Sequence, residues 1–600
     1  MARSPVSPTA GADAVVRVVI QCDGVDQPDL SLISVTVRHA FNDIPWARLV
    51  LADGDMPTGG FTLSDSELFK PGAEVTVRAG YGGDGTDDPI FTGIVVRHGI
   101  SLGDGGESRL NVECRARACR MAVARRTAHH LEQTDSDVIA GLIGSAGLVA
   151  GVAAGSIRHE AMVQYDCCDW DFMLARADAT GWLVNVEGDT VSVQPPTNAS
   201  PALELTWGAD LIDFEADIDA RTQWTAVQAS SWSPGEQAVV QSASTPPHAT
   251  IPANGDLGSA ALAATASPGI LALQTSAPQP KAVLDTWAKA VQLKAELARV
   301  RGRMSFQGSA LAKPGAWAEL KGVGRRFSGP VLLSSVEHEI VEGNWVTRAA
   351  FGLDPTWHAR PPGQAAAAAG GLAPGVGGLQ IGVVLRLDAD PLGEHRVLVR
   401  LSACPAAAEG LWARLLHPQA SSGFGSFFLP EIGDEVLIGH LDQDPAHPVV
   451  LGSLYSSSRK PPHEAAATND IKAIVTRSQH RIEFNDADKV ITITTPSGNR
   501  LEFSDRDRSV VVQDQNANRI SLSESGIVLD SPKDITLAAK GGITLDAVGA
   551  IRIQSKGDLK LEGLNITGAA QVALTVKGGA SAELSASGQT TVKGAMVMIN

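Results

Sequence analysis

The C-terminal part of the chain alternates apolar and polar residues with a fixed period. Between residues 527 and 561, apolar–polar–apolar triplets recur every eight residues, and Gly541, Gly549 and Gly557 stand six residues into three of the repeats. Alternation with period two is typical of β-strands, and a glycine at a constant offset indicates a corner of the chain. Such a short unit cannot bury its apolar face alone and has to stack on its neighbours. The pattern therefore predicts a β-solenoid or β-prism.

Less regular repeats precede this segment. Triplets with apolar first and third residues start at Ile482, Ile491, Leu501, Val510 and Ile520, so their spacing is nine or ten residues before it tightens to eight. The early corners are longer and charged, whereas the later ones consist mostly of Gly, Ala and Ser. We therefore expect the repeats to become slimmer and more regular toward the C-terminus.

The N-terminal region has a different pattern. Residues 14–115 alternate polar and β-branched positions between Gly and Asp clusters, which predicts strands that close into a barrel or sandwich. Two short helices are expected next. Ser136 is the predicted cap of a helix over Asp137–Ile143, and Asp169 is the predicted cap of a second helix that ends at Gly181.

A second all-β region is expected from Leu203 onward. Residues 233–279 are rich in Ser, Ala and Pro and are interpreted as a long loop or insertion. The best helical pattern covers Lys281–Arg301, with Gly302 as its stop. Three alternating strands then precede Arg360–Gly378, a linker by composition.

A compact β module follows this linker. Residues 379–455 contain short alternating strands, for which a five- or six-stranded barrel is the natural closure. Ser456–Asn469 has the composition of a second linker and separates the module from the repeats.

Composition narrows the function classes. A chain of 600 residues with 44% hydrophobic and 19% charged residues can form three or four domains, each with its own hydrophobic core. The net charge of −17 argues against a nucleic-acid partner, which requires a basic face. The six cysteines form no CxxC pair, which favours a reducing compartment over a disulfide framework. The first residues lack the apolar core of a signal peptide, and no apolar run is long enough for a membrane span.

Candidate chemistry is weak throughout the sequence. Gly80-x-Gly82-x-x-Gly85 matches a dinucleotide loop formally, but Thr86–Pro89 follows instead of a helix, which favours a turn. His338-Glu339 begins a zinc-protease-like pattern, yet the alternation around it indicates a strand.

The other candidates have equally ordinary explanations. A zinc set could be imagined from Cys114, Cys119, His129 and His130, but buried thiols explain the cysteines better, and adjacent Cys167 and Cys168 are interpreted as local packing. The chain has no GxSxG motif, no P-loop and no catalytic Cys/His signature. We expect no catalytic residue, no cofactor and no metal site.

Several segments, taken in order, resemble the spike proteins of contractile injection machines. These include the VgrG family of type VI secretion, the hub and spike of contractile phage tails, and the spike of phage-tail-like extracellular injection particles. Residues Gly588–Asn600 resemble the last of these three most. The segments that resemble hub and needle are Gln164-Tyr165, Asp169–Phe172, Arg176-Ala177, Trp207–Leu211, Pro314-Gly315, Leu320–Phe327, Val336–His338, Asn469-Asp470, Ser478–Phe484, Thr495–Asn499 and Lys593–Asn600.

The most specific likeness lies in the compact β module. Phe428–Val436, which reads FLPEIGDEV, together with Asp444-Pro445 and Pro448–Tyr455 resembles the OB-fold at the neck of these spikes. The resemblance marks five signature residues in it: Pro430, Glu431, Gly433, Asp434 and Glu435.

The resemblance implies a mainly β protein with a few helices, built as hub, neck and needle. The implied parts are a disordered N-terminus (1–13), a first barrel-like hub domain with a helical insert (14–200), a second barrel-like hub domain (201–358), a linker (359–378), the OB-fold neck (379–455), a second linker (456–469) and a β-helical spike (470–600). The second linker is too short for the lysozyme domain that some phage spikes carry there.

The number of chains that form the prism is implied by the resemblance and not by the spacing of the repeats. Octapeptides could form three sides of a coil within one chain, whereas the family winds three identical chains into one prism. Each large apolar side chain buried on the axis of such a prism is worth roughly 1.5–3 kcal/mol. The expected trimer core of the needle is Ile527, Leu529, Ile535, Leu537, Ile543, Leu545, Ile551, Ile553, Leu559, Leu561, Val572 and Leu574.

The resemblance also implies partners. The last residues carry no histidines for a tip ion and leave an apolar end, so we expect a separate PAAR-like tip protein to dock on Met596, Met598, Ile599 and Asn600. Further implied partners are inner-tube and baseplate proteins, cargo effectors and the target cell envelope. The implied protein is made in the cytoplasm as part of a particle that stays there or is released.

Other classes of function remain as alternatives. One is a type VI VgrG protein or phage tail spike with envelope-degrading activity, which would require an enzymatic domain. Another is a single-chain adhesin with a β-solenoid stalk. The adhesin would explain the repeats but not the module around Pro430, and it would normally need a secretion signal.

Overall fold

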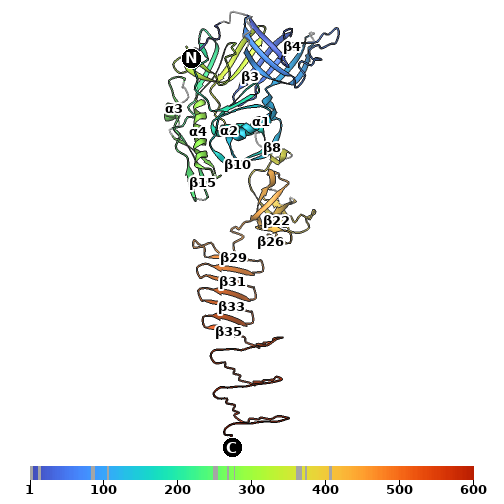
Figure 1. The fold of residues 1–600 in the computed structure, drawn as a ribbon, viewed down its shortest axis with the longest axis vertical. Coiled ribbons are helices and arrows are strands. Elements are labelled where there is room, and N and C mark those ends of the chain that lie inside the picture. Colours follow the sequence, from blue (N-terminus) through green and yellow to red (C-terminus); the bar gives the residue numbers. More distant parts are fainter. Residues whose placement is uncertain are drawn as a thin grey trace. The chain divides into compact units, whose positions relative to one another are not determined.

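The computed structural model describes residues 5–10, 15–82, 88–103, 107–234, 236–247, 254–266, 269–275, 277–359, 368–371, 375–403 and 409–599. The chain forms two units, Met1–Leu454 and Tyr455–Asn600. Among the described residues, no helix is both long enough and apolar enough to cross a membrane. The regular structure of the first unit is mainly β-strand with a few helices, and that of the second is the set of strands between Ile471 and Asp530 (Figure 1).

A 13-stranded sheet runs through both predicted hub regions. Its main path is β14-β18-β21-β20-β3-β4-β7-β6-β5-β1-β2, with β13 and β19 attached through β20. Its strands are β1 (Val16–Cys22), β2 (Val25–Gln27), β3 (Leu32–Ala40), β4 (Trp46–Ala52), β5 (Glu74–Tyr81), β6 (Asp88–Leu102), β7 (Ser108–Arg115), β13 (Leu203–Thr206), β14 (Leu211–Ile218), β18 (Val300–Gln307), β19 (Trp317–Lys321), β20 (Gly329–Val341) and β21 (Asn344–Phe351).

This shared sheet carries two cores, and the first of them includes Ile340 and Trp345 from the second hub region. The first core gathers alternate residues such as Val75 and Val77 around Phe69, and the second gathers Phe306 and Phe351 with their neighbours. The seam between the regions is the antiparallel pair β3–β20. The sequence predicted two barrel-like units, and their joining depends on a pairing between strands almost 300 residues apart, which local alternation does not encode.

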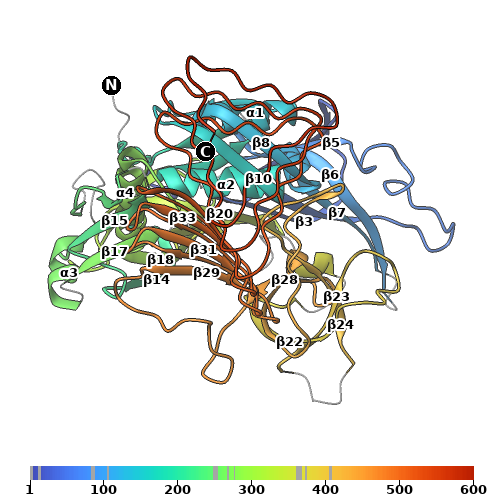
Figure 2. The same cartoon turned by 90° about the horizontal axis from the view of Figure 1, so that it is seen from below.

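Two helices and three small strands form a third core. The helices α1 (Asp135–Ser145) and α2 (Asp169–Thr180) pack with β9 (Val149–Val152), β11 (Leu183–Glu187) and β12 (Thr190–Gln194). The ribbon of β8 (Arg125–Thr134) and β10 (Arg158–Cys168) lies beside both helices (Figure 2).

Both predicted helix caps are wrong by one or two residues. Thr134, not Ser136, caps α1 in a reciprocal capping box with Asp137, and Cys168, not Asp169, caps α2 by accepting from the backbone N–H of Asp171. In both cases a residue before the predicted cap has the extended backbone that a cap requires.

The long helix and its stop also differ from the prediction. The helix α4 spans Lys281–Leu297, and the chain enters β18 at Val300, so Gly302 lies in a strand. A Cβ atom on Gly302 would come within 2.4 Å of the Phe351 ring and 2.5 Å of the Glu215 carbonyl oxygen. The glycine therefore permits a close approach of neighbouring strands and does not end the helix.

The described part of residues 233–279 contains two strands and a helix instead of a continuous loop. These are β16 (Ala238–Gln241), α3 (Ser259–Ala266) and β17 (Ile270–Thr275). Both strands pair with β15 (Ala226–Ser233), and the face of this sheet packs on α4. The Ser- and Ala-rich composition hid these elements because their order depends on packing rather than on strong local propensity.

The module after the hub is a closed five-stranded barrel with the order β22-β23-β24-β28-β27. Its elements are β22 (Gln380–Arg386), β23 (Val397–Leu401), β24 (Leu411–Leu415), β27 (Glu435–His440) and β28 (Pro448–Ser453), with the hairpin of β25 (Ala420–Ser421) and β26 (Phe424–Gly425) before β27. Alternate residues, among them Val384, Val399 and Ile438, fill the barrel.

The second unit begins with a seven-stranded antiparallel sheet in which each strand pairs with the next (Figure 1). Its strands are β29 (Ile471–Val475), β30 (Arg481–Asn485), β31 (Val490–Thr494), β32 (Arg500–Ser504), β33 (Ser509–Gln513), β34 (Arg519–Ser523) and β35 (Gly526–Asp530). Residues 531–599 contain no strand.

Candidate functional site: an apolar assembly surface on the C-terminal sheet

One face of the seven-stranded sheet is apolar on every strand from β30 to β35, and on β29 it carries Lys472 beside Ile474. Cross-strand neighbours from β30 onward are apolar, as in Phe484 opposite Ile491 and Phe503 opposite Val510. We call this set the apolar ladder. It consists of Ile474, Ile482, Phe484, Ile491, Ile493, Leu501, Phe503, Val510, Val512, Ile520, Leu522, Ile527 and Leu529.

The apolar ladder is open to solvent in the single chain. Among its exposed residues, the exposed fraction ranges from 37% for Ile482 to 71% for Ile527. Val511 on the opposite face is only 7% exposed. A contiguous exposed apolar surface of this kind marks an interaction site, because leaving it in water forfeits the free energy of burying it.

The octapeptides that follow are still more exposed. Of the predicted trimer-core residues, Ile527 and Leu529 lie on β35, and the other ten lie beyond the last strand with exposures from 53% for Ile535 to 98% for Val572. Among residues 532–599, no backbone hydrogen bond joins two residues of the chain. Unpaired apolar strands need partners for both side chains and backbone.

The turns of the sheet repeat every 19 residues along one edge. The backbone N–H groups of Thr476, Thr495 and Asp514 donate to the carbonyl oxygens four residues later at 2.9–3.0 Å. The fourth residue of each turn, Gln479, Gly498 or Ala517, has a positive φ. The spacing of nine or ten residues between triplets did not predict this longer period, although Thr, Thr and Asp recur at it in the sequence.

Ion pairs and charged hydrogen bonds connect the turns of the sheet. The Arg506 guanidinium lies 3.0 Å from Asp488 of the preceding corner and also binds Asp507. The hydrogen bond from Arg506 lowers the pKa of Asp507, and hydrogen bonds from the side chain of Asn518 and neighbouring groups lower the pKa of Asp514. These carboxylates are therefore held in the ionised form that their turns require.

The OB-fold signature residues form a tight turn into β27. Gly433 has φ +84°, which favours glycine, and its N–H donates to the Val384 carbonyl at 2.7 Å. The Asp434 carboxylate accepts from the N–H of Glu431 at 2.8 Å, Pro430 is buried, and Glu435 begins the strand. The turn thus closes the barrel between β22 and β27.

The predicted tip-docking residues are fully open to solvent. Met596, Met598 and Ile599 are 79%, 77% and 92% exposed, and Asn600 lies outside the described residues. Their role in docking stays a prediction.

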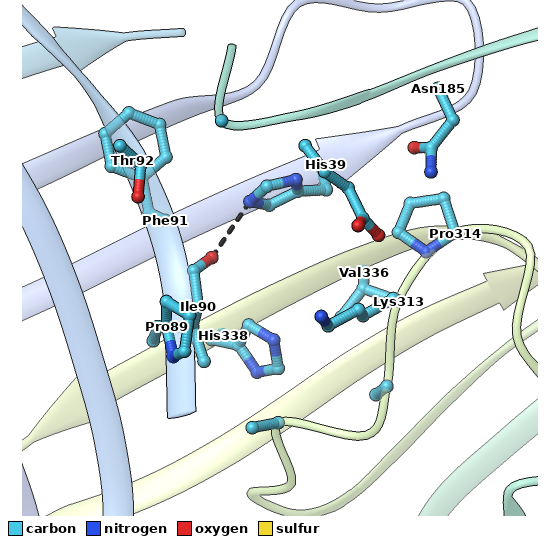
Figure 3. Close-up of a pocket in the computed structure, with 14 residues that line it drawn as sticks. His39, Pro89, Ile90, Phe91, Thr92, Asn185, Lys313, Pro314, Val336 and His338 are labelled. Carbon is cyan, nitrogen blue, oxygen red and sulfur yellow. Dashed lines mark hydrogen bonds between the residues drawn. The ribbon is translucent and has the colours of Figure 1, made fainter. Parts of the chain in front are cut away.

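A cavity of about 260 Å³ lies in the hub between β3, β6, β20 and the turn after β11 (Figure 3). His39 and His338 line it, but both imidazoles are engaged by their surroundings. The Nε2 atom of His39 lies 2.9 Å from the Ile90 carbonyl oxygen, while His338 Nδ1 lies 3.0 Å from Thr347 Oγ1 and accepts from Trp345 Nε1 at 3.3 Å.

Electrostatics agree with a structural role for these two histidines. Burial lowers the pKa of His39, and burial together with the charge of His39 lowers the pKa of His338 to about 3. No serine or cysteine lines the cavity as far as the described residues show.

The remaining sequence candidates are dispersed over several elements. Cys114 is buried in the first hub core, where burial raises the pKa of its thiol to about 12, whereas His129 and His130 lie on β8. Within the described ranges, no three metal-ligating side chains converge. His338 lies in β20, as the alternation predicted, and β6 begins at Asp88, with Gly85 outside the described residues.

Comparison with known proteins places these parts in a family. A model described as the type VI secretion system/phage-baseplate injector OB domain matches residues 380–455. VgrG1a, a type VI secretion system spike protein of Pseudomonas aeruginosa, is 31% identical over 67 residues, which are 11% of this chain and 10% of that protein. The chain thus matches only about a tenth of the length of this curated relative.

Solved structures of phage tail and secretion proteins are also similar. The 43 kDa tail protein of prophage MuSo2 from Shewanella oneidensis has a TM-score of 0.44 and 10% identity, over 57% of this chain and 98% of that one. An E. coli component of the type VI secretion system has a TM-score of 0.36 and 13% identity, over 72% and 99%.

The longest family match covers the hub. A model described as the Alg8 N-terminal domain matches residues 12–342, more than half of the chain. The spike-protein and OB-domain matches confirm the resemblance to VgrG-like hub-and-spike proteins, and by the extent of the longest match the chain belongs to the Alg8 N-terminal domain family.

Proposed function

We propose that this protein is a non-enzymatic, homotrimeric central spike of a contractile injection machine. The observation that carries the proposal is the unpaired apolar surface of the second unit. The apolar ladder and the octapeptides expose apolar side chains along most of residues 471–599, and the octapeptides also form no backbone–backbone hydrogen bond within the chain. Only association with further chains satisfies both needs.

Three copies of the chain would then form a prism with the apolar ladders turned inward. The side chains at the axis would be withdrawn from water, and polar residues of the opposite face, such as Thr492 and Glu502, would face outward. An intertwined prism of this kind resists unfolding kinetically, because separating the chains requires all its rungs to open. That property suits a needle that breaches an envelope by force.

The hub and barrel fit the same proposal. The hub would join the inner tube and baseplate to the spike, the OB-fold would form the neck, and a PAAR-like tip protein would cover the end at Met596, Met598, Ile599 and Asn600. The particle would be assembled in the cytoplasm. The VgrG-like family and the injector OB domain support this arrangement.

The rival functions have less support. A single-chain solenoid adhesin requires the octapeptides to pair with one another, and residues 532–599 show no such pairing. An envelope-degrading enzyme requires a catalytic constellation, and the histidines of the hub cavity are instead engaged in hydrogen bonds within the fold.

The mass of the purified full-length protein in solution tests the proposal. Light scattering at several concentrations should give three times the 62.5 kDa chain mass, and the value should persist on dilution. A stable monomer would refute the three-chain needle and favour the adhesin.

A further inference from the structure

The second unit combines two kinds of repeat with different pairing needs. Residues 471–530 pair strand by strand within one chain, whereas residues 532–599 form no strand pairing and no backbone–backbone hydrogen bond within the chain. We propose that the seven-stranded sheet is the register clamp of the needle: it forms first in each chain, joins three copies through the apolar ladder, and sets the alignment of the octapeptides. This inference rests on the proposed trimer.

The sheet can form early because its contacts are local. Consecutive strands from β29 to β34 start nine or ten residues apart, so each pairing closes a short loop at low entropic cost. The turns are reinforced by side chains, since Asp514 Oδ1 accepts from the N–H groups of Asn516 and Asn518 at 2.9 Å. Pairing of the octapeptides, in contrast, must wait for other chains.

The octapeptides specify their own alignment poorly. The triplets at residues 535–537 and 543–545 are both Ile-Thr-Leu, so a slip of eight residues places identical side chains opposite each other. Register is weakly specified wherever a shift preserves the pattern of side chains. The octapeptides therefore need an upstream element that breaks the equivalence.

The apolar ladder supplies that asymmetry. It carries phenylalanine at two positions, Phe484 and Phe503, and valine at Val510 and Val512, so its rungs differ in width. Its strand spacing alternates between ten and nine residues from β29 to β34, which no eight-residue slip reproduces. Three such faces pack without gaps or clashes in one alignment only. In that alignment each phenylalanine and each valine lies beside the same residue of the other two chains.

Another copy of this chain is the natural occupant of the apolar ladder. The ladder ends at Leu529, and Ile535, the first inward octapeptide residue beyond β35, follows six residues later, so one apolar surface continues from the sheet into the segment that requires other chains. A different partner on the ladder would separate these two parts of the surface. The sheet and the octapeptides therefore share the same partners.

Three full-length variants test this division of roles. Ile493→Asp places a charge on the apolar ladder, and Ile543→Asp places it among the octapeptides. Thr494→Asp places the same charge on the opposite face of the same strand as Ile493, opposite Arg481 and Arg500. Sedimentation over a dilution series measures the trimer, and hydrogen exchange with mass spectrometry measures protection of residues 471–530 and 532–599 separately.

We expect Ile493→Asp to raise the concentration at which the trimer dissociates by at least about tenfold, the effect of losing one buried apolar contact. Thr494→Asp should leave the trimer unchanged, because its carboxylate lies outside the apolar ladder and opposite two arginines. Ile543→Asp should keep the trimer and the protection of residues 471–530 while residues 532–599 lose theirs. Preserved protection of residues 481–494 in Ile493→Asp shows that its sheet still folds.

The contrary result is equally clear. A trimer that survives Ile493→Asp, or one that Ile543→Asp dissociates to the same extent, would overturn the clamp while leaving the proposed trimer intact. A monomeric wild-type protein would instead overturn the proposed function. The two failures are therefore distinguishable.

Discussion

Asp178 on α2 and Lys294 on α4 form an ion pair with a distance of 2.7 Å from Lys294 Nζ to the nearer carboxylate oxygen. The two side chains are only 10% and 16% exposed. The pair joins the helical insert of the first hub region to the long helix of the second. His358, near the end of the second region, donates its backbone N–H to the same carboxylate at 2.8 Å.

Removing one partner of this pair should destabilise the hub. Lys294→Met leaves a shielded carboxylate without its cation, and we expect a loss on the order of 3 kcal/mol in the free energy of unfolding. Lys281→Met is the matched control, because Lys281 pairs with Asp285 on the same helix with side chains 59% and 28% exposed, and its removal should cost less than about 1 kcal/mol. Equal losses in denaturant titrations would contradict the structural role of Asp178.

The cap of α1 gives a second prediction. Thr134→Ala removes the hydroxyl that accepts from the Asp137 N–H at 3.1 Å and should reduce stability by about 1 kcal/mol. Thr134→Ser keeps the hydroxyl and should have little effect. Thermal unfolding followed by circular dichroism compares the two, and an equally large loss in both variants would argue against the capping box.

The turns that recur every 19 residues predict opposite changes in stability for substitutions at two equivalent positions. Ala517 has φ +68°, a region that costs an alanine about 1 kcal/mol, so Ala517→Gly should stabilise the sheet by about that amount per chain. Gly498 occupies the same turn position, and a Cβ atom there would have open space within 4 Å, so Gly498→Ala should destabilise the turn through the backbone alone. Hydrogen exchange of residues 471–530 measures both, and changes of the same sign would refute the equivalence of the turns.

His338 makes hub stability depend on pH. Its pKa of about 3 in the folded protein lies below the value near 6.5 that an unfolded chain has. The unfolded state therefore binds more protons between these values, and the contribution to stability is complete above pH 6.5 and declines as the pH falls toward 3. His338→Gln should remove roughly one proton from the slope of stability against pH in this window. Parallel curves for variant and wild type, measured by denaturant titration, would contradict this prediction.

Much of the fold was predictable where local patterns dominate. The strands of the hub, the β module and the rungs up to Ile527 alternate clearly, and the structure has strands at these places. Elements that depend on distant pairing were missed, such as β17 on β15 and the joining of the hub regions through β3 and β20. The predicted end of the helix at Gly302 was wrong, because Gly302 lies in a strand and neighbouring strands pack closely against it.

The candidate site was predictable in part. Alternation identifies which residues share a face, so the apolar positions of the ladder followed from the sequence. The positive φ at the fourth position of the turns did not follow from the sequence, because Gln479 and Ala517 stand where Gly498 stands in the middle turn, and these residue types do not favour that region. Burial of His338 beside Trp345 also required the packed hub, since an alternating strand places a histidine on a face without saying what covers it.

The sequence by itself determined the β periodicity, the change from nine- and ten-residue to eight-residue repeats, and the identity of the apolar face. Only the tertiary structure decided that residues 471–530 pair within the chain while residues 532–599 do not. The reason is physical. Side-chain alternation specifies which face is buried, whereas the partner of a strand depends on turn geometry and on the surfaces available to it.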